Sequence, residues 1–154
     1  MINLPMLAFK MTGIGEYIEL NIEEVYGFPH ETSYGGGYGA KGILTIHVDN
    51  YSVSANHYFT TGELYRFLKE LNLCYKKLSG TAVLENTEHE LKLKCEFNKY
   101  GHVFISGEFQ ANIMINNILS FEIKTDQTQI KDSINNLELV YEIFGDEKGK
   151  KIKT

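Results

Sequence analysis

The stretch FTTGELYRFLKELNLCYKKLSG, residues 59–80, divides the sequence into two parts of similar design. Leucines recur every three or four residues along one stripe from Leu64, and Tyr75 joins them, which is the spacing of one face of an α-helix. Thr60 is a suitable N-cap, and Glu63 stands three residues later to complete a capping box. We therefore predict a helix over residues 60–78.

Four segments before this helix are predicted to be strands. They are residues 4–10, 16–25, 43–48 and 51–59. In the second of them, EYIELNIEEV, Ile18, Leu20 and Ile22 alternate with polar residues, so one face of the strand is apolar. Asp49-Asn50 separates the last two segments, and both residues tolerate the left-handed backbone of a two-residue hairpin turn.

The same order of elements follows the helix. We predict strands over residues 81–85, 90–97, 101–109 and 117–124, and a second helix from Asp126 to Phe144. Asp126 and Gln129 stand 66 positions beyond Thr60 and Glu63, an offset that fits either a duplication or a coincidence between two amphipathic helices. The predicted fold class is α+β, with two antiparallel sheets of about four strands each and two helices in the order ββββα-ββββα. Residues 1–144 would form a single domain, and residues 145–154 a disordered tail.

The composition is that of an ordinary globular domain. The chain has 154 residues, of which 43% are hydrophobic and 23% charged. No apolar run is long enough to cross a bilayer, and the N-terminus lacks the basic region of a signal peptide, so we expect a cytoplasmic protein with no membrane partner. In that compartment Cys74 and Cys95 are expected to be reduced, semi-buried thiols.

Residue types that perform catalysis do not cluster in the sequence. The five histidines show no metal-ligand spacing, and neither cysteine stands in a nucleophile motif. We therefore expect no catalytic residues, no metal and no cofactor, and we predict that the protein is not an enzyme.

The glycine-rich stretch SYGGGYGAKG, residues 33–42, contains Gly37-x-Gly39-x-x-Gly42, which resembles a phosphate-binding loop. A dinucleotide loop needs a helix after it, because the helix N-terminus supplies the amides that hold the phosphate. Here the glycines lead into a predicted strand, and a Walker A loop would require Ser or Thr where Gly42 stands. A connection between two strands explains the stretch better, and binding of a small ligand is the lesser alternative.

The first forty residues are acidic and include a tyrosine-bearing loop. The net charge is −5, and residues 1–40 hold five glutamates against one lysine. Such a surface suits a basic protein partner and disfavours nucleic acid, although solubility alone would also explain it. Tyrosines among glycines are typical of adaptable recognition surfaces. The candidate partner-binding residues are Glu16, Glu19, Glu23, Glu24, Glu31, Tyr34 and Tyr38.

From residue 59 onward, five segments stand in a recognisable order. They are FTTGELYRFLKEL (59–71), LSGTAVL (78–84), ELKL (90–93), GHVFISG (101–107) and LSFEIKTDQT (119–128). The matching residues include Gly101-His102-Val103, where two strands join, and Asp126-Gln127-Thr128, at the head of the last helix, and the order and spacing of the segments together carry the resemblance. Over about residues 41–140, this order resembles the WapI-type family of small bacterial immunity proteins. The resemblance implies a protein that neutralises a polymorphic toxin by tight binding.

The functional hypothesis is an immunity protein that binds a cognate toxin domain, often a nuclease, and blocks its active site. Glutamates on the outward face of residues 16–24 would meet the basic groups with which a nuclease holds its substrate. The partner would be a basic protein domain, and the chain itself a monomer or a weak homodimer.

The alternative hypothesis is a single-stranded nucleic-acid-binding module of the Whirly type, since that fold also combines four-stranded sheets with helices. Such a module needs a basic groove with stacked aromatic rings. The sequence offers only Lys92 and Lys94 on one strand face, offset by Glu90 and Glu96. We therefore expect no nucleic-acid partner.

Overall fold

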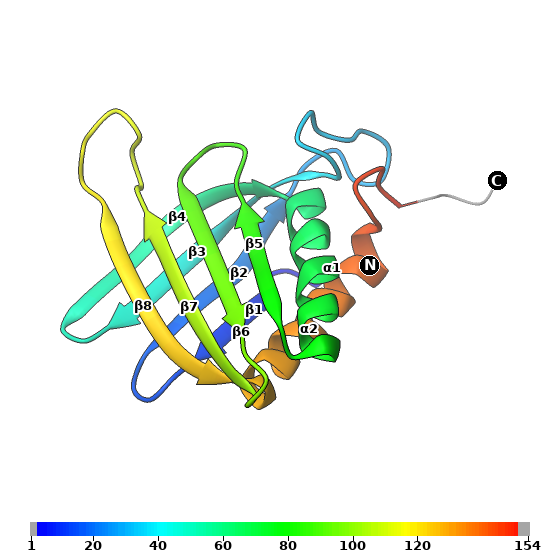
Figure 1. Cartoon of the computed structure of the whole chain (residues 1–154). Helices are drawn as coiled ribbons and strands as arrows, with labels where there is room; N and C mark the ends of the chain where they lie inside the picture. The colour runs from blue at the N-terminus through cyan, green and yellow to red at the C-terminus, as the bar shows by residue number, and fades with distance from the viewer. Residues whose placement is uncertain (1–2, 151–154) are drawn as a thin grey trace.

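The structure, a computed structural model, describes residues 3–150 and confirms the predicted α+β architecture. Within these residues, ten elements follow the order ββββαββββα, and we refer to the elements up to the first helix and those after it as two halves (Figure 1). The first half contains β1 (Met6–Thr12), β2 (Tyr17–Val25), β3 (Gly39–Val48), β4 (Tyr51–Thr60) and α1 (Thr61–Lys77). The second half contains β5 (Gly80–Glu85), β6 (Leu91–Phe97), β7 (His102–Phe109), β8 (Leu119–Asp126) and α2 (Gln127–Phe144).

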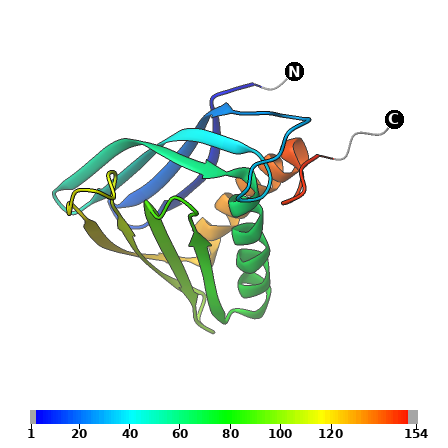
Figure 2. The same cartoon turned by 90° about the horizontal axis from the view of Figure 1, so that it is seen from above.

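Each half forms one antiparallel sheet, because consecutive strands pair in the orders β1-β2-β3-β4 and β5-β6-β7-β8. We call these sheets A and B. Alternation decides which side of each strand is buried: Leu20 and Leu44 of sheet A, and Leu93 and Ile105 of sheet B, are all exposed by 1% or less. Figure 2 shows the two sheets facing each other with both helices along one side, and the buried side chains of all these elements form one hydrophobic core.

The helices pack across the boundary between the halves. α1 packs against β5 of sheet B, α2 packs against β1 of sheet A, and the two helices contact each other. Both helices begin with the same hydrogen bond, in which the first helical amide donates to the residue that precedes the third strand of the sheet. Thr61 N donates to Tyr38 O, and Gln127 N donates to Gly101 O, both at 2.9 Å. The 66-residue offset between the helix caps therefore coincides with a repeated local geometry.

Helix side chains close the strand edges that the helices cover. Glu70 of α1 accepts a hydrogen bond from Val83 N of β5 at 2.9 Å. Ser133 of α2 donates to Lys10 O of β1 at 2.7 Å. These side chains form hydrogen bonds with backbone groups of the edge strands, and those groups would otherwise be free to pair with another strand.

Residues 145–150, which were assigned to a tail from the sequence, form a turn with a bridge between Asp146 and Gly149. Glu147 O accepts a hydrogen bond from Gly37 N at 2.6 Å, and Lys150 N donates to Tyr38 OH at 2.9 Å. The turn is thus held by the glycine-rich stretch of the first half, through contacts that no local sequence pattern reveals. The remainder of the predicted tail, 151–154, lies outside the described residues.

Candidate functional site

The glycine-rich stretch packs against the N-terminus of α1. The first three amides of the helix donate to Tyr38 O, Gly36 O and Thr60 Oγ1. A side chain on Gly37 would collide with Thr61 and Gly62, so the two backbones approach as closely as they do only because glycine is present. The amides that would hold a phosphate are therefore already bonded within the chain, which supports a structural role for this stretch.

A buried carboxylate joins the two halves beside this stretch. Glu63 is 2% exposed, and its oxygens accept hydrogen bonds from Thr60 N at 2.9 Å, Asn86 Nδ2 at 2.8 Å and Thr87 N at 3.0 Å. Thr60 is the N-cap of α1 and completes the predicted capping box with Glu63, whereas Asn86 and Thr87 belong to the β5–β6 turn. Three donors on one carboxylate offset the cost of removing it from water. Glu63 therefore fixes the β5–β6 turn relative to α1.

The β5–β6 turn also closes part of the edge of β4. Tyr58 N donates to Glu90 Oε1 at 3.2 Å, and Tyr58 O accepts from Asn86 Nδ2 at 3.1 Å. Both backbone groups of Tyr58 are thereby occupied, while its side chain remains 47% exposed. The turn thus prevents strand pairing at this point and leaves the aromatic ring available for contact.

Three tyrosines line a hollow next to the β5–β6 turn. The hollow measures about 280 Å³, and its walls include Tyr26, Tyr34 and Tyr58 together with Thr87 and Glu88. Tyr34 is fully exposed, and the other two tyrosines are each 47% exposed. We call this hollow the tyrosine pocket. Because Tyr26 and Tyr34 belong to the β2–β3 connection and Tyr58 to β4, the pocket exists only in the folded chain.

Carboxylates surround the tyrosine pocket. Glu24 accepts a hydrogen bond from Tyr26 OH at 2.6 Å, and this bond raises the pKa of Tyr26 to about 12, so the phenol remains protonated at neutral pH. Glu88 lines the pocket from the β5–β6 turn. A cationic side chain entering the pocket would find aromatic faces and carboxylates together, which is the combination that binds Lys or Arg.

The structure brings only part of the predicted partner-binding set to this pocket. Tyr34 lines it, Glu24 stands beside it, and Glu31 is exposed on the same β2–β3 connection. Tyr38 is buried instead, at 1% exposure, with its ring centroid 5.2 Å from that of Phe28. Its hydroxyl group is satisfied inside the fold, which allows a tyrosine to be buried, so Tyr38 is not available to a partner.

The glutamates at the start of the chain do not form a continuous acidic stripe. Glu16 and Glu24 lie at opposite ends of β2, and Glu19, between them, has Lys10 Nζ 4.0 Å from its carboxylate. A β-bulge between Ile22 and Glu24 leaves Glu23 out of the strand register. The alternation predicted for residues 16–24 therefore breaks, and the outer face of sheet A carries mixed charge.

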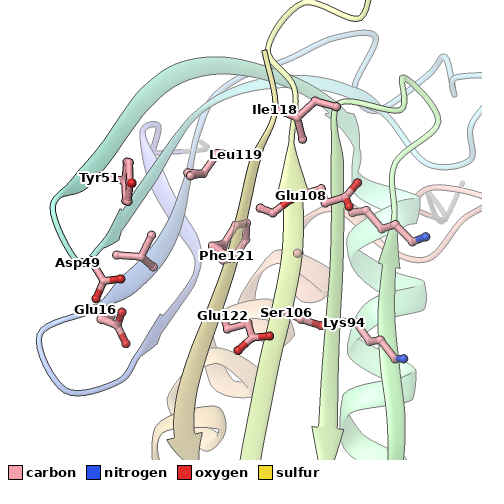
Figure 3. A pocket seen from close by; sticks show the side chains of 14 residues that line it. Glu16, Asp49, Tyr51, Lys94, Ser106, Glu108, Ile118, Leu119, Phe121 and Glu122 are labelled. Atoms are coloured by element: carbon pink, nitrogen blue, oxygen red, sulfur yellow. The ribbon is translucent and has the colours of Figure 1, made fainter. Parts of the chain in front are cut away.

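A larger hollow of about 910 Å³ lies between β8 and the β3–β4 turn and extends over sheet B. Figure 3 shows Glu16 and Asp49 on one side of this hollow, and Lys94, Glu108 and Glu122 on sheet B. Its ionisable groups are spread over separate walls and do not converge on one point. Within residues 3–150, no group of three or more His, Cys, Asp or Glu side chains is placed to hold a metal ion.

Cys95 and His57 are buried, neutral members of the core. Cys95 is fully buried, and burial raises the pKa of its thiol, which favours the unreactive thiol over the thiolate. His57 is 1% exposed and packs against Phe59 and Phe109, and burial lowers the pKa of its imidazole to about 4. Its Nδ1 lies 3.3 Å from Glu90 Oε1 but finds no hydrogen-bond partner among the described residues, so the two groups are in contact without forming an ion pair.

The predicted partner-binding set omits three members of the tyrosine pocket: Tyr26, Tyr58 and Glu88. The signal for Tyr58 was available, because it stands between two inward-facing residues, His57 and Phe59, and must therefore point outward. Its position beside Tyr26 depends on the pairing of β3 with both β2 and β4, which alternation alone does not determine.

The fold defines a small α+β domain with two antiparallel four-stranded sheets and two helices. Residues 9–145 match the immunity protein WapI-like family, and the chain belongs to that family. The match begins before the motifs that carried the resemblance and includes most of β1 and all of β2. No curated protein and no solved structure is matched by this chain. Neither α1 nor α2, the helices of residues 3–150, is long and apolar enough to cross a membrane.

Proposed function

We propose that this chain neutralises a toxin domain in the cytoplasm by binding it through the tyrosine pocket and the carboxylates around it. Membership of an immunity family supports the activity. The convergence of Tyr26, Tyr34 and Tyr58 on one hollow supports the surface. In this proposal the chain catalyses no reaction, because occupation of the toxin's active site is sufficient for inhibition.

The physical argument for this surface is the combination of aromatic area and negative charge. Tyrosines contribute large contact area with little loss of side-chain freedom, and they are enriched among the residues that dominate binding energy. Glu24 and Glu88 add carboxylates at the same place. A toxin that acts on nucleic acid needs Lys and Arg in its active site, and those groups would be drawn to this pocket and neutralised there.

The proposal is tested by titrating the chain against the toxin domain encoded beside its gene. Tyr34→Ala and Tyr58→Ala are each expected to weaken binding by about thirtyfold, the scale of a central aromatic contact. Glu24→Lys with Glu88→Lys should slow association and reduce its dependence on salt, because long-range attraction is lost.

A matched control is Glu138→Lys with Glu142→Lys, the same charge change at two exposed positions on α2. It should leave affinity and salt dependence within about twofold of the unmodified chain, since both positions lie outside the pocket. Binding that survives both tyrosine substitutions and the double reversal would place the interface elsewhere. If the unmodified chain neither binds the toxin domain nor protects cells from it, the proposed function itself fails.

The nucleic-acid alternative finds no support in the outer faces of the sheets. On sheet B, the exposed lysines Lys92 and Lys94 stand among glutamates, and Lys94 Nζ is 3.1 Å from Glu96. On sheet A, Lys10 stands beside Glu19. Alternating charges of this kind do not provide the continuous positive groove that a single strand requires.

A further inference from the structure

The β7–β8 connection, residues 110–118, presents apolar side chains to water. Ile113 is 57% exposed, Met114 87% and Ile115 52%, and Ile118 at the end of the same connection is 48% exposed. Three consecutive large apolar residues in this state contribute nothing to the core. Clustered exposure of this kind marks a contact surface more often than a chance arrangement.

The connection is held in one conformation by its own polar residues. Asn112 Oδ1 accepts from Met114 N at 2.9 Å, and Asn112 O accepts from Ile115 N at 3.1 Å. Gln110 Nε2 donates to Ile115 O at 2.9 Å, while Gln110 N donates to Glu90 O of the β5–β6 turn at 2.8 Å. The apolar side chains are therefore displayed on an ordered support, which lowers the entropy cost of binding.

The connection lies on the same edge of the molecule as the tyrosine pocket. The β2–β3, β5–β6 and β7–β8 connections all stand at the top of Figure 1. A hollow of about 440 Å³ links them, since its walls include Thr87, which also lines the tyrosine pocket, and Ile118. One partner could cover both places without crossing the body of a sheet.

We propose that the side chains of Ile113, Met114 and Ile115 insert into an apolar depression on the toxin domain, next to the basic active site that the tyrosine pocket covers. The inference rests on the proposed function and adds a second anchor to it. An apolar anchor surrounded by charged groups is the usual arrangement of a tight interface, because the centre excludes water and the rim sets orientation.

The charges around the connection favour this occupant. The linking hollow contains Glu85, Glu90 and Glu108 against Arg66 and Lys92. Arg66 is already 3.4 Å from the carboxylate of Glu147, outside the hollow, so the balance at this edge is negative. A basic protein surface complements it, whereas a second copy of the chain would bring the same negative edge against itself. An anionic membrane would repel it for the same reason.

The test compares two sets of exposed apolar residues in the complete chain. The triple variant Ile113→Ser, Met114→Ser and Ile115→Ser is expected to bind the same toxin domain about a hundredfold more weakly, with little change in unfolding temperature because none of the three side chains packs in the core. The control is Ile14→Ser, the same chemical change at a residue that is 99% exposed in the β1–β2 turn at the other end of the sheet. It should bind like the unmodified chain.

A second variant tests the support without removing any apolar contact. Gln110→Ala deletes the hydrogen bond to Ile115 O and should weaken binding about fivefold through loss of preorganisation. If the unmodified chain binds the toxin domain and the triple variant binds equally tightly, the second anchor is refuted while the proposed function stands. Failure of the unmodified chain to bind refutes both. If sedimentation shows that the unmodified chain is a dimer and the triple variant a monomer, the surface binds a second copy and the inference is refuted. The inference is also refuted if the unmodified chain binds vesicles of anionic lipid and the triple variant does not.

Discussion

The N-termini of α1 and α2 have the same geometry and opposite surroundings. In each, the first helical amide donates to the residue before a strand, and the N-cap side chain accepts from the residue three positions later. Around α1, however, Thr60 and Glu63 are buried under the glycine-rich stretch and the β5–β6 turn, whereas Asp126 and Gln129 of α2 are exposed.

This difference between the two helix N-termini explains why the candidate site lies beside only one of them. The polar groups at the start of α1 are used to hold long connections in place, and the tyrosine pocket is built from those connections. The start of α2 follows β8 directly and bonds to the short β6–β7 turn through Gly101 O, and its N-cap Asp126 accepts from Gln129 N without holding a long connection. The same local geometry is therefore structural at both helices, and only one of them supports a candidate site.

The largest expected contrast comes from Glu63 and its counterpart Gln129. Glu63→Ala leaves three donors without their acceptor in a buried place and should lower the free energy of unfolding by about 3–5 kcal/mol. Gln129→Ala removes an exposed side chain and should change it by less than about 0.5 kcal/mol. Urea denaturation measures both. Similar losses at the two positions would mean that the buried network contributes no more than an ordinary helix start.

Acid should lower the stability of the protein through His57, a position of the first half whose counterpart in the second half is apolar. His57 of β4 corresponds, by the same 66-residue offset, to Ile123 of β8. Burial lowers the pKa of His57 to about 4, below its unfolded value, so the unfolded chain binds the extra proton and stability falls as the pH decreases from about 6.5 toward 4. We expect a loss of about 2 kcal/mol between pH 7 and about pH 5.

The control for this pH dependence is His57→Ile, which installs the residue of the corresponding strand position. Its stability should no longer fall as the pH decreases over the same range, as measured by urea denaturation at several pH values. Glu90, which contacts His57, has a pKa raised by burial and works in the opposite direction, so the measured slope is smaller than the histidine alone would produce. An unchanged slope in the variant would show that His57 is not its source.

The smallest contrast is expected at the N-caps themselves. Thr60→Ala should cost about 1.5–2 kcal/mol, because the capped amide of Glu63 is buried, and Asp126→Ala about 0.5–1 kcal/mol, because water can replace the lost acceptor. Thermal unfolding of the two variants ranks them. An equal or reversed ranking would contradict the role assigned to burial.

The fold could be predicted from the sequence because its signals are local. Alternation in segments such as EYIELNIEEV, and the leucine spacing after Thr60, depend only on which face of an element is buried. One local departure, the β-bulge before Glu24, moved Glu23 out of register and so broke the expected acidic stripe. Bulges of this kind leave no clear mark in a lone sequence.

The candidate site was harder to predict because it is assembled from distant segments. Tyr38 stands among glycines, which suggests a mobile loop, yet its hydroxyl is bound by Pro29 O and Lys150 N, and the latter is 112 positions away. Tyr58 reaches Tyr26 only through strand pairing. The side chains of the tyrosine pocket meet at one edge of the molecule because of how the strands pair. The sequence predicted the order of the elements but not which of their connections lie side by side.

The link between Tyr38 and Lys150 has a consequence for biosynthesis. The strands of sheet A can pair as soon as they leave the ribosome, since their contacts are with neighbours in the chain. The glycine-rich stretch obtains its bonds to Glu147 and Lys150 only after those residues have been translated. This stretch is therefore completed late, and a nascent chain interrupted before residue 147 would carry the strands of sheet A without the bonds that hold the glycine-rich stretch.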